Sequence, residues 1–203
     1  MICIIQNGFI DSNINLYLNK EYIIYKSYQV DVSMIDVESF DIFILLGGYQ
    51  SVNKLDMYPY LKNVIHLISK LDEKKIPLLG ICLGCELIAK TFGCTIKPLN
   101  EGIIDYNTKI VFENISYENI FRYHYDYIVE NDKIDVLYKY NNIPYLIQKN
   151  KCIGIQCHPD IPPEHIQKYI NNFDINYNIS KTEINETNKK LLIHLITYLL
   201  KLD

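Results

Sequence analysis

The chain has 203 residues, of which 49% are hydrophobic and 22% charged, a composition typical of a globular protein and not of a disordered one. Its formal net charge is −4, which excludes the basic surface that nucleic-acid binding requires. The start of the chain lacks the pattern of a signal peptide, and no stretch reaches the ~18 apolar residues of a membrane span, so we expect a cytoplasmic protein with no membrane partner.

The first half of the chain alternates apolar strands with amphipathic helices. We predict strands at residues 2–6, 22–30, 41–46 and 76–81, and helices at residues 12–20, 59–73 and 85–92. Residues 41–46 are almost wholly apolar, as expected of a strand that is buried on both faces. This alternation predicts a parallel sheet with right-handed crossovers.

After Gly93 the pattern becomes richer in short β-like runs. We predict two such runs within residues 95–112, then a short helix or turn at 114–121, further runs at 123–129, 136–140 and 143–148, and a last strand at 152–157. A short helix begins at residues 162–164, a polar loop follows at 172–183, and an amphipathic helix covers 184–202. No linker interrupts the chain, so residues 1–203 are predicted to form one α/β domain, an open and mostly parallel twisted sheet flanked by helices, with a small antiparallel β extension.

Residues 80–84 read Gly-Ile-Cys-Leu-Gly and join a buried strand to a helix. A cysteine between two glycines at such a turn matches the pattern of a nucleophile elbow, with Cys82 in the place that serine takes in hydrolases. The positive potential of the helix N-terminus favours a reactive thiolate. The alternative is a structural cysteine that is buried at the end of a strand.

Two other predicted strands also end in residues that suit catalysis. Gly47 and Gly48 follow the third strand, and the last strand runs into His158-Pro159-Asp160. Because parallel strands end at one edge of a sheet, His158 can act as general base for the nucleophile, with Asp160 orienting the histidine ring. Taken singly, each has a simpler interpretation: a turn, a core histidine and a solvated carboxylate.

Backbone N–H groups near the elbow are candidates for an oxyanion hole. The residue after an elbow nucleophile directs its N–H toward the reacting oxygen, which assigns Leu83 to this role. The turn at Gly47 and Gly48 can supply the second donor, from Gly48.

Cys82 and Cys85 also form a C-x-x-C pair, which is a motif of redox proteins. A redox site does not require the flanking glycines, so we rank this interpretation below the elbow. A zinc site is less favoured still, because no second pair of cysteines or histidines has ligand spacing. Six cysteines in a chain that we expect to be cytoplasmic indicate free thiols and not a disulfide framework.

These motifs together resemble the class I (triad) glutamine amidotransferases. The resemblance covers about residues 40–165 and rests on Gly-Ile-Cys-Leu-Gly followed by Glu86, the Gly-Gly pair, and Gln-x-His-Pro-acid. Residues 121–126 resemble the F-x-x-H-x-D segment of the branch that holds GMP synthase amidotransferase domains and stand-alone γ-glutamyl peptidases. The resemblance implies a flavodoxin-like architecture and a substrate pocket that includes Gly47, Glu86, Tyr123 and His124.

The implied reaction is attack of Cys82 on the side-chain amide of glutamine or a γ-glutamyl compound, with release of ammonia or an amine and hydrolysis of a γ-glutamyl thioester. It implies no cofactor and no metal. The partners are a γ-glutamyl small molecule and, if the chain is an amidotransferase subunit, a separate synthetase. The alternatives are a stand-alone γ-glutamyl peptidase and a non-catalytic binding or regulatory member of the fold.

Three positions depart from the pattern of the resembled family. Glu86 stands where glutamine is usual, Asp160 where glutamate is usual, and Tyr49 follows the Gly-Gly pair where the GMP synthase branch usually has proline. The first change alters the polarity of the pocket wall, the second shortens the orienting carboxylate by one methylene, and the third reshapes the oxyanion loop.

Overall fold

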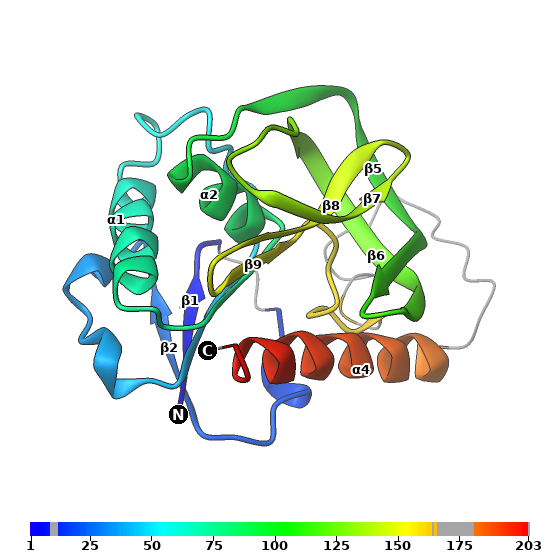
Figure 1. Ribbon diagram of the computed structural model, residues 1–203, viewed down its shortest axis with the longest axis horizontal. Helices are drawn as coiled ribbons and strands as arrows, with labels where there is room; N and C mark the ends of the chain where they lie inside the picture. Colours follow the sequence, from blue (N-terminus) through cyan, green and yellow to red (C-terminus); the bar gives the residue numbers. More distant parts are fainter. Residues whose placement is uncertain (9–11, 164, 166–180, 203) are drawn as a thin grey trace.

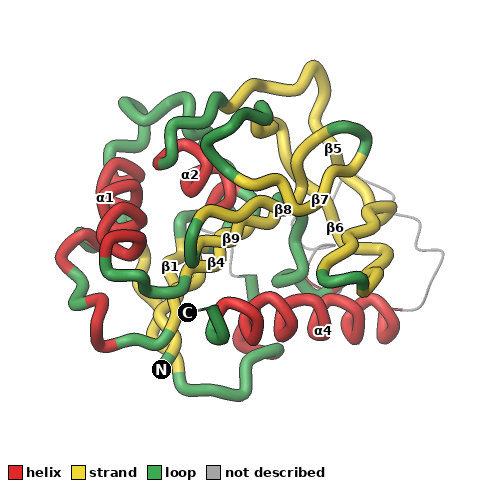
Figure 2. Tube along the Cα trace, in the orientation of Figure 1, coloured by secondary structure: helices red, strands yellow, loops and turns green. Residues whose placement is uncertain are grey.

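A seven-stranded sheet forms the centre of the molecule, with helices on both of its faces and a separate two-stranded sheet beside it (Figures 1 and 2). The computed structural model describes residues 1–8, 12–163, 165 and 181–202. The strand order in the large sheet is β2-β1-β3-β4-β9-β8-β7. The first five of these strands are mutually parallel, and β8 and β7 are antiparallel additions at one edge.

The parallel strands are β1 (Ile2–Gln6), β2 (Tyr22–Lys26), β3 (Ile42–Leu45), β4 (Leu78–Ile81) and β9 (Cys152–Ile155). The antiparallel edge consists of β7 (Asp135–Tyr140) and β8 (Ile143–Lys149), and the small sheet of β5 (Ile96–Phe112) and β6 (Ile115–Ile128). The helices are α1 (Tyr60–Glu73), α2 (Leu83–Thr91) and α4 (Lys181–Leu199), with short 3₁₀ turns η1 (Ile14–Leu16), η2 (Val32–Met34) and η3 (Val37–Ser39). The predicted single α/β domain with a mostly parallel sheet is confirmed.

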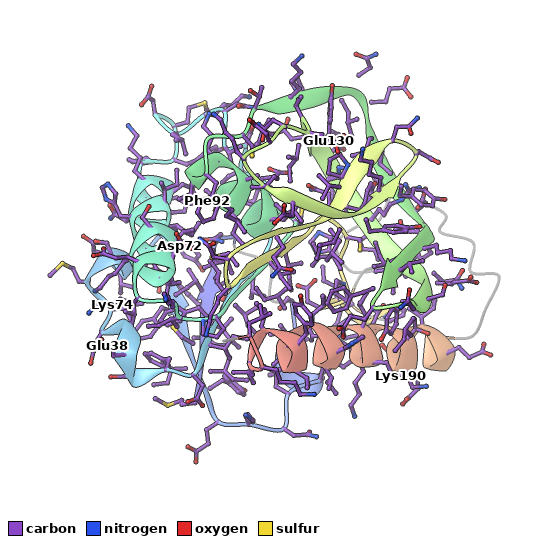
Figure 3. The ribbon with its side chains drawn as sticks, viewed as in Figure 1. Glu38, Asp72, Lys74, Phe92, Glu130 and Lys190 are labelled. Atoms are coloured by element: carbon purple, nitrogen blue, oxygen red, sulfur yellow. The ribbon has the colours of Figure 1, made fainter. Side chains whose placement is uncertain are left out.

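Two hydrophobic cores lie on opposite faces of the large sheet, because successive side chains of a strand point to opposite sides. In β1, Cys3 and Ile5 join the core that contains α1 and α2, whereas Ile2 and Ile4 join the core that contains α4. Charged side chains such as Glu38, Lys74 and Lys190 lie at the periphery (Figure 3). The wholly apolar character of the central strands is therefore explained by burial on both faces.

The segment 95–128 differs most from the sequence prediction. Residues 96–112 form one long, irregular strand and not two short runs, and residues 115–121, predicted as a helix or turn, belong to β6. Glu113 and Asn114 form the connecting turn, with φ values of 47° and 64°. Two consecutive residues with positive φ are typical of a tight β-hairpin. Asn114 is a sequence signal for such a turn, but the weak alternation in the flanking strands makes the hairpin hard to predict.

The helix predicted at residues 12–20 is also wrong, since only the 3₁₀ turn η1 forms there. Asn13 adopts a left-handed conformation with φ 57°, which stops a longer helix from starting at this point. The last helix begins at Lys181, three residues before the predicted start. Of the helix start predicted at 162–164, Pro163 is helical and residue 164 lies outside the described residues. Of the polar loop predicted at 172–183, residues 181–183 belong to α4 instead, and the rest lies outside the described residues.

The first turn of α2 packs directly against the sheet, and glycine makes this possible. A Cβ atom at Gly84 would lie 2.3 Å from the carbonyl oxygen of Leu45, and one at Gly80 would lie 2.5 Å from the carbonyl oxygen of Gly84. Both contacts involve backbone atoms, so neighbouring side chains cannot relieve them by changing rotamer. The glycines that bracket the elbow are therefore a packing requirement.

Gly84→Ala is expected to lower the free energy of unfolding by at least about 2 kcal/mol, because the overpacking cost exceeds the ~1 kcal/mol that alanine gains in a helix. Urea denaturation measures the change. Ser69→Ala, at an exposed position of α1, is the control and should stay within about 0.5 kcal/mol of the wild type. An unchanged midpoint for Gly84→Ala would contradict this packing.

Candidate active site

Cys82 occupies the turn between β4 and α2 with φ 52° and ψ −107°. A non-glycine residue in this region is strained and persists only where surrounding contacts hold it. Here the Cys82 N–H donates to the carbonyl of Ile155 at 2.8 Å, and the Cys82 carbonyl accepts from the N–H of Glu86 at 3.0 Å. This is the geometry of a nucleophile elbow, and the side chain is 5% exposed.

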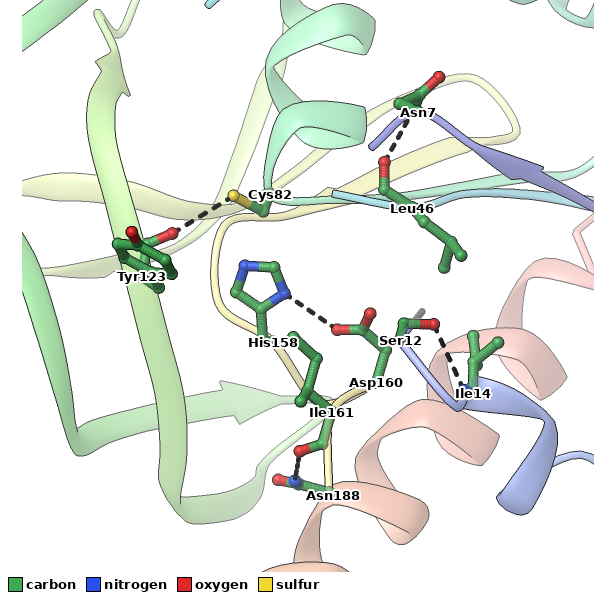
Figure 4. A network of polar contacts seen from close by, with 10 residues as sticks. All are labelled: Asn7, Ser12, Ile14, Leu46, Cys82, Tyr123, His158, Asp160, Ile161 and Asn188. Atoms are coloured by element: carbon green, nitrogen blue, oxygen red, sulfur yellow. Dashed lines mark hydrogen bonds and ion pairs between the residues drawn. The ribbon is translucent and has the colours of Figure 1, made fainter. Parts of the chain in front are cut away.

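The predicted partners of Cys82 lie next to it, on the segment that follows β9. Figure 4 shows the His158 ring between the side chains of Cys82 and Asp160. The distance from His158 Nδ1 to Asp160 Oδ1 is 3.1 Å. A Cβ atom at Gly47 would lie 2.8 Å from His158 Cε1 and 3.3 Å from Cys82 Cβ, so both side chains flank the same point.

The electrostatic surroundings of His158 favour its charged form. Burial of the ring opposes a positive charge, but the Cys82 thiolate and the Asp160 carboxylate outweigh burial and raise the pKa of His158 to about 10. Asp160 is 1% exposed, so solvent screens this contact little. The arrangement therefore favours a protonated His158 ring between Cys82 and Asp160.

The glycine turn after β3 lies beside the elbow. A Cβ atom at Gly48 would lie 3.0 Å from Leu83 Cδ2, so the glycine turn packs against the Leu83 side chain, and the oxyanion role of the two N–H groups stays a prediction. Leu83 is the first residue of α2, and N–H groups in the first turn of a helix have no acceptor within the helix. Tyr49, which follows the glycines, is 59% exposed and packs edge-on against Tyr58.

Asn7 and Gln50 support this glycine turn, and neither was predicted. The Asn7 side chain donates to the carbonyl of Leu46 at 2.8 Å (Figure 4), and the Gln50 side chain donates to the carbonyl of Asn7 at 3.1 Å. Both side chains are buried. The signal for Asn7 was available, because it ends β1 at the same sheet edge as Gly47 and Cys82.

Tyr123 and His124, both predicted pocket residues, lie on β6 and face opposite ways. The Cys82 thiol donates to the carbonyl of Tyr123 at 3.6 Å, so this residue borders the nucleophile (Figure 4). His124 is buried, with Nδ1 at 2.8 Å from the carbonyl of Asp126 and Nε2 at 2.7 Å from the Tyr145 hydroxyl. Burial lowers the pKa of His124 to about 4, so a neutral ring donates to the carbonyl and accepts from Tyr145. Neither nitrogen is offered to a ligand, and a pocket role for this ring stays a prediction.

A buried polar network behind β6 continues from His124 and was missed by sequence reasoning. The Tyr145 hydroxyl accepts from Arg122 Nη1 at 3.3 Å, and Arg122 forms a two-pronged ion pair with Asp105. On the other side of His124, Asp126 accepts from the Ser51 hydroxyl at 2.6 Å, which ties β6 to the loop after the glycine turn. The network fixes the strand whose carbonyl meets Cys82.

Glu86 lies one turn of helix after Cys82 and is buried. Gln156 Nε2 donates to Glu86 Oε1 at 3.0 Å, which links α2 to the segment that carries His158. Desolvation raises the pKa of Glu86 to about 8, so the neutral form dominates at pH 7. A neutral carboxylic acid is close to a glutamine side chain in shape and polarity, which explains how glutamate can occupy this position.

The stability of the wild type relative to Glu86→Gln is expected to fall by about 4 kcal/mol between pH 5 and pH 9. The folded state keeps the Glu86 proton up to its pKa of about 8, whereas the unfolded chain releases it near the ordinary value of 4.5. The unfolded state therefore binds fewer protons in this window, and stability declines as pH rises. Denaturation across the window measures the effect, and the exposed Glu73→Gln should give a flat difference.

The remaining cysteines and acidic groups give little support to redox or zinc chemistry. All six cysteines are free and buried, and Cys85 points away from the site, since a Cβ atom at Gly154 would lie 2.6 Å from its sulfur. Burial and the nearby Glu86 raise the pKa of Cys85 well above its ordinary value.

Among the described residues, no cluster of three or more histidines, cysteines or carboxylates could hold a metal ion. None of the described helices has both the length and the apolar character to cross a membrane.

Comparison with known proteins gives a matching family model and a relative of similar length. The family model "Glutamine amidotransferase class-I" matches residues 6–176. A glutamine amidotransferase-like protein of Acanthamoeba polyphaga mimivirus is 44% identical over 203 residues, which cover 98% of this chain and 97% of the relative.

More distant matches include a GMP synthase and a solved structure. The GMP synthase of Helicobacter pylori is 30% identical over 140 residues, which cover 64% of this chain and 26% of the synthase. This chain therefore matches only about a quarter of the length of that enzyme. The crystal structure of a glutamine amidotransferase from Thermotoga maritima shares the fold, with a TM-score of 0.77, 20% identity, and coverage of 99% of this chain and 98% of that one.

Proposed function

Because this chain belongs to the class I glutamine amidotransferase family, we propose that it hydrolyses the side-chain amide of glutamine or of another γ-glutamyl compound, with Cys82 as nucleophile. The family supports an amide-hydrolysing function. The observation that carries the assignment of Cys82 is its place on a strained strand-to-helix turn, with the His158 ring beside it and Asp160 behind that ring.

The proposed reaction begins with attack of the Cys82 thiolate on the amide carbon, which moves the carbonyl electrons onto oxygen. The N–H groups of Gly48 and Leu83 stabilise this oxyanion. His158 then donates its proton to the amide nitrogen, the C–N bond breaks, and ammonia or an amine leaves. A γ-glutamyl thioester remains on Cys82.

Hydrolysis of the thioester returns the enzyme to its starting state. His158, now neutral, takes a proton from water, and the oxygen of that water attacks the thioester carbon. The C–S bond breaks, glutamate leaves, and Cys82 regains the thiolate form beside the protonated histidine. All proton transfers use side chains of this chain and water, so the proposal requires no cofactor and no metal.

The pocket in this proposal is bordered by the Gly47 turn, Glu86 and Tyr123. Glu86 in its neutral form can both donate and accept a hydrogen bond, which suits a substrate with polar α-amino and α-carboxyl groups. Free thiols at all six cysteines suit a reducing compartment, and we place the reaction in the cytoplasm. If ammonia is passed on, the acceptor site lies on a separate synthetase.

The test is incubation of the purified chain with glutamine and with a panel of γ-glutamyl peptides, followed by assays for glutamate and for ammonia or the released amine. Partner-free cleavage of a peptide supports a γ-glutamyl hydrolase. Weak glutamine hydrolysis that a co-purified synthetase stimulates supports an amidotransferase subunit. Hydrolysis of neither class, with Cys82 reduced and the fold intact, would support a non-catalytic member of the fold.

A further inference from the structure

Exposed apolar side chains gather at the outer edge of the large sheet, around β2. Ile24 is 44% exposed, and Tyr22 and Ile23 are similarly exposed, whereas every residue of the adjacent β1 is buried. Met34, at 79% exposure, and Val30 lie next to this strand and line a hollow with Ile23 and Tyr25. An edge strand with this composition is a ready template for another strand, and proteins normally protect such edges with charges or proline.

The backbone of β2 shows which of its residues face outward. The N–H of Ile2 donates to the carbonyl of Glu21, and the N–H of Ser27 donates to the carbonyl of Gln6. In a parallel pair, the residues that bond to the neighbouring strand alternate along the chain, so the odd-numbered residues of β2 bond to β1. The N–H and C=O groups of Tyr22 and Ile24 and the N–H of Lys26 therefore point away from β1, toward the open edge, whereas the carbonyl of Lys26 accepts from N–H groups of the turn that follows β2.

We propose that β2 pairs with β2 of a second copy of this chain, antiparallel and about a two-fold axis beside Ile24. In this register Ile24 lies opposite Ile24 of the second copy, and Tyr22 lies opposite Lys26 of the second copy. The Ile24 pair exchanges two hydrogen bonds, as the narrow pairs of an antiparallel ladder do, and the N–H of each Lys26 donates to the carbonyl of Tyr22 of the other copy. The two seven-stranded sheets become one continuous sheet.

The side chains favour a second copy over an unrelated strand, because β2 is complementary to itself in this register. The two Ile24 side chains meet at the two-fold axis. On the other face of the sheet, Ile23 lies opposite Tyr25 of the second copy. No two like charges lie opposite one another in this register. A closed two-fold contact also uses the same surface on both copies, so both apolar edges are covered at once. The exposed Val30 and Met34 beside the strand enlarge the apolar contact.

Light scattering of the purified chain should give twice the 23.9 kDa of one copy. Ile24→Lys places two ammonium groups against each other at the axis and should weaken association at least ~tenfold, and Ile24→Glu should do the same with two carboxylates. A mixture of these two variants pairs lysine with glutamate and should restore the doubled mass. Ile193→Lys, at a residue of α4 that is 40% exposed, is the matched control and should stay dimeric.

The proposal would be overturned if the wild-type protein scattered light as a monomer at concentrations up to about a hundred micromolar. A dimeric Ile24→Lys variant would also overturn it. Failure of the mixed variants to associate would overturn the register at Ile24. If the variants lose their folded circular dichroism spectrum, hydrogen exchange of the wild type decides. The amides of Ile24 and Lys26 should gain protection as concentration rises, and unchanged protection there would refute the pairing.

Discussion

Cys82→Ala is expected to reduce amide hydrolysis to the background rate, a loss of at least ~10⁴-fold in kcat. The thioester route has no other nucleophile, because no alternative thiol shares the elbow geometry and the His158 contact. The substitution removes one sulfur atom from a small side chain, so the fold should persist. Comparison of turnover for the wild type and the variant, at matched circular dichroism, measures the loss.

Chemical labelling provides an independent check on the same residue. An electrophilic glutamine analogue should modify Cys82 first, and peptide mass spectrometry locates the adduct. Burial raises the pKa of the Cys3 and Cys152 thiols to about 12, and burial also raises the pKa of Cys157, so these thiols should react slowly. Cys152→Ala should label as the wild type does. An adduct chiefly at another cysteine would refute the nucleophile assignment.

His158→Ala is expected to lower kcat by ~10³-fold or more, because both thiolate formation and protonation of the leaving nitrogen depend on this ring. Asp160→Asn should lower kcat by a smaller factor than His158→Ala does, since Asp160 contacts the ring and not the reacting atoms. Kinetics of both variants, with folding verified by thermal melts, test this order of effects.

The pH profile separates the two roles further. Asp160→Asn removes a carboxylate that helps to raise the pKa of His158, so the alkaline limb of its rate profile should move to lower pH. A profile identical to that of the wild type would show that Asp160 does not act through His158. A larger loss for Asp160→Asn than for His158→Ala would mean that the two roles are wrongly assigned.

The sheet and its C-terminal edge could be predicted because their signals are local. The central strands are short apolar runs, and the glycines around Cys82 and after β3 mark sharp turns at known positions of the chain. Parallel topology then brings strand ends together whatever their separation in sequence. This reasoning placed Cys82, His158 and Asp160 at one edge, where the structure brings them together.

The segment that closes the site could not be predicted in the same way. In β6, polar and aromatic residues alternate because the strand faces both a buried network and the candidate pocket, which conceals the usual apolar pattern. Contacts such as Arg122 with Asp105, or Gln50 with the Asn7 carbonyl, join residues that are far apart in the sequence, and nothing in the sequence says which polar residues pair. The neutral state of Glu86 depends on burial, which only the folded chain reveals.

The hairpin of β5 and β6 meets the site through main-chain atoms. The carbonyl of Tyr123 accepts from Cys82, and the carbonyl of Phe121 accepts from the N–H of His158 at 2.8 Å. Neither contact depends on which side chain the residue carries, and β5 and β6 form a sheet of their own. Replacement of outward residues such as Tyr123 and Tyr125 can therefore change which molecule is accepted and leave the reacting groups in register. In evolution or in engineering, we expect the outward side chains of the hairpin to vary while its main chain keeps the same contacts with Cys82 and His158.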